Sequence, residues 1–427
     1  METLLSQSGY ARTNNPLDAD FVLINTCAVR EKAVHKIYSD LGRMRLIREN
    51  NPNLLVGVAG CVVEQEKETL VKRFPFVDLL FGPDHIRRLP EMLGEVEARR
   101  AKNGSSLLQT GFDARQDFQF VNVLPNPEES PVKAFVNIQK GCDNICSFCI
   151  VPFVRGREVS RSADDILEEI KALTDRGVKE VMLLGQNVNS YGFKSADGVS
   201  FAQLLERIAR QTTLTRLRFT SSHPKDVGDD LIDQYACNPI LAPHFHLPVQ
   251  AGSDAVLKAM RRQYSRDDYL RIIEALKLRV PGIAFSTDII VGFPGESDAD
   301  FRQTLSLMEA VRYDLVYSFA YSQRPYTSAI KLADDVPLEV KKARLAELQA
   351  LSDEHTLAIH ESAVGQIKEV LVETCDDSDT LVYKGRTGCN KVVHFTGASC
   401  VYGERVQVAI KQANPHSLFG ETACPNS

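Results

Sequence analysis

The chain has 427 residues, 44% of them hydrophobic and 25% charged, with a formal net charge of −6. This length suggests two or three domains, and the composition argues against a disordered chain. No apolar run approaches the roughly 20 residues of a membrane-spanning helix, and the N-terminus lacks the layout of a secretory signal. We therefore expect a cytoplasmic protein without a membrane partner. The acidic balance argues against bulk nucleic-acid binding but leaves room for a local basic face.

Ten cysteines are a high number for such a chain. Without a secretory signal, a disulfide framework is the poorer explanation, and metal binding or catalysis is the better one. Three of them, Cys142, Cys146 and Cys149, crowd together, whereas the others are scattered.

The first region predicts an α/β domain over residues 1–101. Apolar runs at 21–25, 54–60 and 78–82 read as buried strands, and residues 28–49 carry apolar positions at helical spacing. Strand and helix alternating at this length favour a parallel sheet. Residues 102–131 are rich in Gly, Ser, Asn and Pro, which is typical of a linker.

A longer strand–helix series predicts a second domain over residues 132–361. The expected strands are 134–138, 180–185, 217–221, 244–249, 285–292 and 315–321, separated by helical patterns that include 163–175, 226–236, 266–278 and 297–311, and a long charged helix over 336–361 closes the domain. Six such repeats indicate a partial or full barrel of parallel strands, whose chemistry lies at the C-terminal strand ends.

The last region, residues 362–427, changes character. Short β-branched segments bounded by Gly, Asp and Asn predict a small antiparallel β-barrel.

The strongest chemical signal is the spacing of Cys142, Cys146 and Cys149 directly after the first barrel strand. Thiolates are the soft ligands of iron–sulfur clusters and of zinc. Three cysteines instead of four would leave one iron with an open coordination position. A zinc site with a distant fourth ligand is the alternative.

This loop resembles the cluster loop of radical S-adenosylmethionine enzymes. The segments 25–31, 60–61, 155–161, 184–192, 246–253 and 286–296 resemble motifs of the methylthiotransferase family within that superfamily, and the C-terminal barrel resembles the RNA-binding TRAM domain. The resemblance covers nearly the whole chain. It implies a partial (β/α)6 barrel of the radical S-adenosylmethionine type and a first [4Fe-4S] cluster on Cys142, Cys146 and Cys149.

Polar and small residues follow the expected barrel strands where the cofactor would bind. The residues expected to hold S-adenosylmethionine are Gly185, Gln186, Asn187, Gln250, Asp288 and Gly292. Plain turn or packing roles are the alternative for each residue taken alone.

Cys27 and Cys61 follow neighbouring strands of the first domain. C-terminal ends of parallel strands share one edge of a sheet, so both thiols should lie there. Buried core cysteines are the alternative. The resemblance implies that both are ligands of a second, auxiliary [4Fe-4S] cluster. The family uses three cysteines there, and we expect the third to lie upstream of Met1.

Arg155, Arg157 and Arg161 form a basic group just after the cluster loop and are expected to bind tRNA phosphates. The C-terminal barrel offers a further set for RNA, namely Tyr383, Lys384, Arg386, Lys391, His394 and Phe395. A solvated surface is the alternative for that set.

The resemblance implies methylthiolation of C2 of N6-dimethylallyladenosine in tRNA, 3′ of the anticodon. S-adenosylmethionine would serve as methyl donor and as radical source. The enzyme would be a monomer, and its partner would be a reducing electron donor. One alternative is the same chemistry on threonylcarbamoyladenosine in tRNA or on a ribosomal protein aspartate. Another is an RNA-binding iron–sulfur protein without turnover.

Overall fold

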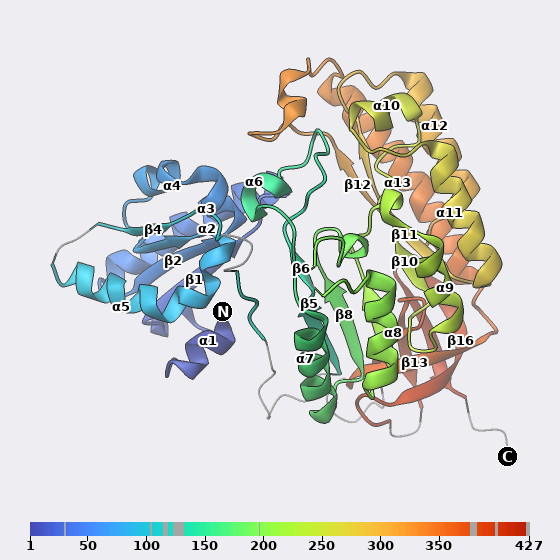
Figure 1. Ribbon diagram of the computed structural model, residues 1–427, viewed down its shortest axis with the longest axis horizontal. Helices are drawn as coiled ribbons and strands as arrows, with labels where there is room; N and C mark the ends of the chain where they lie inside the picture. Colours follow the sequence, from blue (N-terminus) through green and yellow to red (C-terminus); the bar gives the residue numbers. More distant parts are fainter. Residues whose placement is uncertain are drawn as a thin grey trace. The chain divides into compact units, whose positions relative to one another are not determined.

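The computed structural model describes residues 1–29, 31–102, 105–113, 118–122, 132–195, 197–375, 382–397 and 400–423. The chain forms two compact units (Figure 1). The first consists of Met1–Val123, Lys140–Val159 and Ser322–Ile330, and the second of Leu124–Gln139, Ser160–Tyr321 and Lys331–Ser427. The cysteine loop at 142–149 therefore belongs to the same unit as the N-terminal sheet.

The first unit contains a parallel sheet in the order β1-β2-β3-β4. Its strands are β1 (Phe21–Thr26), β2 (Leu55–Gly60), β3 (Leu79–Phe81) and β4 (Leu107–Gln109), and its helices are α1 (Glu2–Gln7), α2 (Glu31–Asn50), α3 (Cys61–Glu66), α4 (Glu68–Arg73) and α5 (Leu89–Arg100). The three predicted strands and the predicted parallel sheet are confirmed.

The fourth strand lies inside the segment that we predicted as a linker, so that prediction is wrong for residues 107–109. Leu107 is buried and pairs with Leu79 of β3. A three-residue strand is too short to show a period, and the surrounding polar residues hid it.

The second unit contains the six predicted parallel strands. They are β5 (Lys133–Asn137), β8 (Glu180–Leu184), β9 (Arg216–Phe219), β10 (His244–His246), β11 (Ala284–Val291) and β12 (Leu315–Ala320). They form two sheets, β5-β8-β9 and β10-β11-β12, linked by a parallel bridge from Leu217 to Leu241. The predicted partial barrel is confirmed. The short pair β6 (Gln139–Lys140) and β7 (Val159–Ser160) lies outside these sheets.

Helices cover one face of these strands (Figure 1). They are α7 (Ala163–Asp175), α8 (Phe201–Gln211), α9 (Asp229–Cys237), α10 (Asp254–Ala259), α11 (Arg266–Arg279), α12 (Asp298–Val311) and α13 (Leu338–Glu361). Side chains from them and from alternate strand positions such as Val136, Leu217 and Phe245 form one buried core. The remaining strand positions face the interior of the barrel, because successive strand side chains point to opposite faces.

Local sequence explains where these helices begin. Ser162, Ser200, Ser265 and Ser297 precede α7, α8, α11 and α12, and each side chain accepts a hydrogen bond from a backbone N–H of the first turn. Such a cap stabilises a helix by about 1 kcal/mol.

The small C-terminal barrel is closed, in the order β13-β14-β15-β17-β16. Its strands are β13 (Ile367–Cys375), β14 (Val382–Thr387), β15 (Val392–Thr396), β16 (Arg405–Asn414) and β17 (Ser417–Thr422). The small barrel was predicted from the sequence. One pair, β15 with β17, is parallel, so the predicted antiparallel pairing does not extend to that pair.

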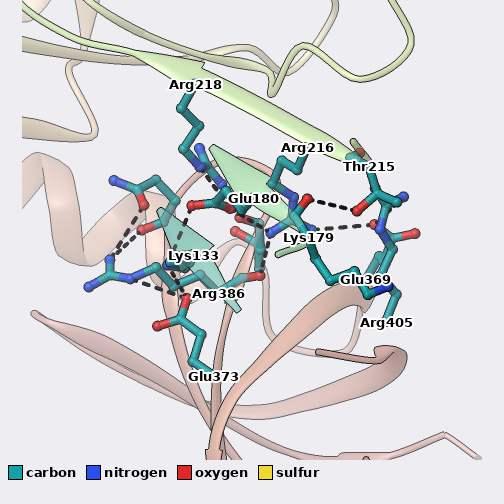
Figure 2. Close-up of polar contacts among 12 residues, drawn as sticks. Lys133, Lys179, Glu180, Thr215, Arg216, Arg218, Glu369, Glu373, Arg386 and Arg405 are labelled. Atoms are coloured by element: carbon teal, nitrogen blue, oxygen red, sulfur yellow. Dashed lines mark hydrogen bonds and ion pairs between the residues drawn. The ribbon is translucent and has the colours of Figure 1, made fainter. Parts of the chain in front are cut away.

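A buried ion-pair network joins the small barrel to the starts of β5, β8 and β9 (Figure 2). Glu180 is at its centre, with Oε2 3.4 Å from Arg216 Nη1 and 3.2 Å from Arg218 Nε. Arg218 Nη2 donates to the carbonyl of Thr387 at 2.9 Å, and Lys133 pairs with Glu373. The small barrel is thereby fixed to the N-terminal ends of these strands.

Candidate functional site

Cys27 and Cys61 lie at one edge of the first sheet, as the sequence predicts. Thr26, the last residue of β1, is in register with Gly60, the last residue of β2, so each cysteine follows its strand at the same level. Thr26 Oγ1 donates to the Ala59 carbonyl at 2.7 Å and accepts from the Val62 N–H at 3.2 Å. Cys27 is exposed, whereas Cys61 is buried at 1% exposure.

Gly60 is required at this edge. Its φ is +102°, and a Cβ on it would lie 2.4 Å from the Thr26 carbonyl oxygen. Only glycine adopts this conformation with the neighbouring strand end so close. The backbone therefore brings the chain ahead of Cys61 directly against the residue that precedes Cys27.

The cluster loop has a similar glycine. Gly141 has φ +72°, and a Cβ on it would lie 2.1 Å from the Arg157 carbonyl oxygen. The Cys142 N–H donates to the Gly156 carbonyl at 3.2 Å, and the Cys149 N–H donates to the Cys146 carbonyl at 3.1 Å. Backbone hydrogen bonds thus fold the loop back on itself around its thiols.

The three loop thiols differ in environment. Burial raises the pKa of the Cys142 thiol to about 11, while Cys146 and Cys149 are partly exposed. Throughout the described residues, no group of three Cys, His, Asp or Glu side chains converges on a point that would hold a single ion. A four-iron cluster spreads its thiolates over separate corners, and three cysteines on one folded loop, two of them partly exposed, are a donor set suited to it.

The exit of the cluster loop packs against Cys61 within the first unit. Ile150 and Val154, on the loop's exit helix α6 (Val151–Arg155), share a buried core with Cys61 and Val62. Arg155 Nε donates to Cys61 Sγ at 3.3 Å.

The segment Ser322–Ile330 adds further links. The Ala329 N–H donates to the Ser147 carbonyl at 2.8 Å, and the Tyr326 hydroxyl donates to the Gln65 carbonyl at 3.2 Å. Residues far apart in sequence therefore hold both groups of cysteines in one unit, which no local pattern in the sequence indicates.

In the second unit, the residues expected to bind the cofactor follow the barrel strands. Gly185 comes directly after β8, Gln250 follows β10, and Gly292 follows β11. Gln250 has φ +72°, its N–H donates to the Asp288 carbonyl at 2.8 Å, and its own carbonyl accepts from Ile290 at 2.9 Å. These residues share the C-terminal side of the strands, where barrel chemistry is expected.

Two of these positions have structural partners. Asn187 Nδ2 donates to Asp226 at 2.7 Å. Gly292 has φ +70°, and a Cβ on it would lie 2.3 Å from Cγ of Lys341. The lysine stem occupies the space beside the Gly292 Cα, so that space is not open to a ligand.

Sequence reasoning missed a polar and aromatic group on the interior face of the barrel. His246 Nδ1 lies 2.9 Å from Ser286 Oγ, and its Nε2 lies 3.8 Å from Asp288. The Tyr317 ring packs edge-on against His246 with centroids 5.8 Å apart. Tyr317 and Phe135 are 43% and 63% exposed, although Val136 next to Phe135 is buried in the core and Val316 next to Tyr317 packs against that core. Aromatic residues at the polar positions of alternating strands are the signal that would have found them.

Two of the three arginines do not have the environment that phosphate binding requires. Arg161 is buried at 3% exposure, pairs with Glu169 and donates to the Asp165 carbonyl. Our prediction that Arg161 binds RNA is therefore wrong, because its charge is already neutralised inside the second unit. Arg155 is partly buried against Cys61. Arg157 is exposed, and its ion pair with Asp143 is loose at 3.8 Å.

The residues suggested for RNA in the small barrel also divide. Tyr383 and Phe395 are buried inside it and stack with centroids 5.5 Å apart, so they cannot form an RNA face.

A partly exposed face is formed by Lys384, His394 and Phe419, which are in register on β14, β15 and β17. The rings of His394 and Phe419 stack with centroids 5.3 Å apart. Lys391 pairs with Asp314, and Arg386 donates to the Asn390 carbonyl at 3.2 Å.

Comparison with known proteins defines the class. Residues 136–308 match the radical SAM superfamily, residues 1–82 match the uncharacterized protein family UPF0004, and residues 361–423 match the TRAM domain. The fold is similar to that of the radical S-adenosylmethionine methyltransferase TsrM from Kitasatospora setae, with a TM-score of 0.54 and 16% identity over 84% of this chain and 69% of that one. The chain is a radical SAM protein that carries a TRAM domain.

The particular family follows from closer relatives. The chain is 45% identical to the tRNA-2-methylthio-N(6)-dimethylallyladenosine synthase of Burkholderia mallei (strain SAVP1), over 99% of this chain and 92% of that protein. It is 44% identical to the synthase of the same name from Bordetella pertussis (strain Tohama I), over 99% and 94%. The chain belongs to the tRNA-2-methylthio-N(6)-dimethylallyladenosine synthase family.

Proposed function

We propose that this protein adds a methylthio group to C2 of N6-dimethylallyladenosine in tRNA, at the adenosine 3′ of the anticodon, with S-adenosylmethionine as methyl donor and radical source. The observation that carries the proposal is the 45% identity over almost the full length of a synthase of that name, in a chain whose cysteines occupy suitable positions.

Two cysteine sets would hold two [4Fe-4S] clusters: Cys142, Cys146 and Cys149 the first, and Cys27 and Cys61, with a ligand beyond them, the auxiliary one. When bound, the first cluster would supply the electron that cleaves S-adenosylmethionine to methionine and a 5′-deoxyadenosyl radical. The chain's own contribution is to position the thiols: Gly141 and Gly60 permit the two close backbone approaches that shape these loops.

The barrel of the second unit would bind and orient the cofactor and the reacting base. Gly185, Gln186, Asn187 and Gln250 offer backbone and amide groups beside the strand ends. Deeper in the barrel, Tyr317 and Phe135 offer exposed rings on which an adenine could stack, and Asp288 and His246 offer hydrogen-bond partners for its edge.

For tRNA we propose the outer face of the small barrel formed by Lys384, His394 and Phe419. A cation next to a stacked aromatic pair suits a phosphate and an unpaired base of the anticodon stem-loop.

No helix among the described residues is long and apolar enough to cross a membrane. We propose a monomeric cytoplasmic enzyme that receives electrons from a separate reducing protein.

The test is anaerobic reconstitution with iron and sulfide, followed by incubation with S-adenosylmethionine, a reductant and tRNA that carries N6-dimethylallyladenosine. Mass analysis of the nucleosides should show the 2-methylthio derivative together with 5′-deoxyadenosine. Product formed only with threonylcarbamoyladenosine tRNA, or only on a ribosomal protein aspartate, would show that the enzyme acts on that substrate instead. Tight tRNA binding without formation of 5′-deoxyadenosine would show that the protein binds RNA but is not catalytic.

A further inference from the structure

Arg155 has an unusual partner for an arginine. Its Nε lies 3.3 Å from Cys61 Sγ, in hydrogen-bonding geometry. Among the described residues no carboxylate pairs with Arg155, in contrast to Arg157, which lies 3.8 Å from Asp143. Cys61 is buried at 1% exposure, whereas Arg155 is only partly buried.

The backbone fixes Arg155 on both sides. Val154 is fully buried in the core that also contains Cys61. Gly156 follows with φ +73°, and a Cβ on it would lie 3.2 Å from the ring of Phe112. The chain can turn at Gly156 because glycine accepts this conformation, so the arginine at the end of α6 is aimed at the sheet edge by packing on one side and by the turn on the other.

A buried sulfur that ligates iron is a thiolate, and its negative charge needs a partner in place of water. An arginine suits this position because its guanidinium stays charged and its Nε–H has a fixed direction. Hydrogen bonds to ligand sulfurs raise the reduction potential of iron–sulfur clusters, since they stabilise the more negatively charged reduced state.

We propose that Arg155 is a positioning residue for the auxiliary cluster: it orients the Cys61 sulfur and sets the reduction potential of the cluster which that sulfur helps to hold. This inference rests on the proposed function, in which Cys61 is a cluster ligand. It assigns Arg155 to the sulfur chemistry and removes it from the group of tRNA-binding arginines.

The test uses the full chain with Cys142, Cys146 and Cys149 all changed to Ala, so that bound iron reports only the site of Cys61. In this background we compare Arg155→Gln, Arg155→Lys and the matched control Arg157→Gln, which removes an exposed charge two residues away. The measurements are the midpoint potential of the cluster in a redox titration followed by electron paramagnetic resonance, and the rate of iron release to a chelator.

Arg155→Gln should shift the potential to more negative values and release iron roughly 10-fold faster or more, as is typical when an outer partner of a metal ligand is lost. Arg155→Lys should recover most of the potential because it restores the charge, and Arg157→Gln should match the parent. An unchanged potential and release rate in Arg155→Gln would overturn the proposal. So would a lysine variant no better than glutamine, because a packing role alone predicts that result.

A failure of this inference can be distinguished from a failure of the proposed function. A parent variant that takes up no iron would show that the site of Cys61 holds no cluster in this chain and would overturn this inference. The proposed function fails by a separate result, namely a fully loaded wild-type protein that makes no methylthiolated tRNA.

Discussion

Arginines in two regions of this molecule have partners of different kinds. At the base of the barrel, Arg216 and Arg218 are neutralised by Glu180 and by acceptors of the small barrel (Figure 2). At the edge of the N-terminal sheet, Arg155 faces a cysteine sulfur. In a network of paired charges each arginine is neutralised, and a structural role accounts for it. A guanidinium that faces a cysteine sulfur is neutralised only when that sulfur carries a negative charge.

The same contrast separates neighbours in sequence. Arg155 and Arg161 are six residues apart, yet one faces Cys61 and the other pairs with the buried Glu169. The partner therefore decides the role of a basic residue, and the basic composition of the segment does not.

The largest expected effect is at the cysteine loop. Cys146→Ala should lower the formation of 5′-deoxyadenosine by more than about 100-fold, because the first cluster loses one of its three thiolates. The assay is anaerobic, with product measured by chromatography. Cys237→Ala, at an exposed cysteine on α9, is the control and should retain the wild-type rate. A normal rate in the Cys146 variant would mean that the loop does not hold this cluster.

At the base of the barrel the expected effect is on stability. Glu180→Gln should lower the free energy of unfolding by about 3–5 kcal/mol, because it leaves buried cations without their partner. Denaturant unfolding measures the loss. The control is Glu206→Gln, which breaks an exposed 2.7 Å pair with Arg210 and should cost less than about 1 kcal/mol. Equal losses in both variants would show that the network is not central to stability.

The network should also depend on pH. Burial alone would raise the pKa of Glu180, but Arg218, Lys133 and Arg216 outweigh it and lower the pKa. A carboxylate whose pKa is lowered in the folded state stabilises the fold at pH values above the ordinary glutamate pKa of about 4.3. It loses that effect as the pH falls through the folded-state pKa. The stability difference between wild type and Glu180→Gln should therefore narrow below about pH 4. A constant difference between pH 7 and pH 3 would contradict this assignment.

A smaller effect is expected for tRNA binding at the small barrel. Phe419→Ala should weaken tRNA affinity by about 1–3 kcal/mol, the usual contribution of one stacked base, and Lys384→Ala should reduce the salt slope by about 1. Lys171→Ala, exposed on α7, is the control. Filter binding across a salt series measures both quantities. Wild-type affinity in the Phe419 variant would move the RNA interface away from this face.

The smallest effect concerns the exposed arginine beside the cluster loop. If Arg157 contacts a tRNA phosphate, Arg157→Gln should weaken tRNA binding by about 1 kcal/mol or less at physiological salt and leave the formation of 5′-deoxyadenosine unchanged. The same binding assay and the cofactor cleavage assay measure these two quantities. A change in cleavage without a change in binding would place Arg157 with the cysteine chemistry instead.

The sequence by itself determined the elements and the chemistry of the ligands. Apolar runs and helical spacing predicted the six barrel strands, and the spacing of Cys142, Cys146 and Cys149 identified the loop, because these signals are local. The parallel register that brings Cys27 and Cys61 to one edge was also predictable, since parallel strands end on the same side.

Only the tertiary structure decided which side chains meet. Whether Arg161 faces solvent or Glu169, and whether Arg155 faces phosphate or Cys61, depends on contacts between segments that are distant in sequence or on opposite sides of a turn. The parallel pair β15–β17 escaped prediction for the same reason. Pairing partners and burial arise from long-range packing, and a local sequence pattern specifies neither of them.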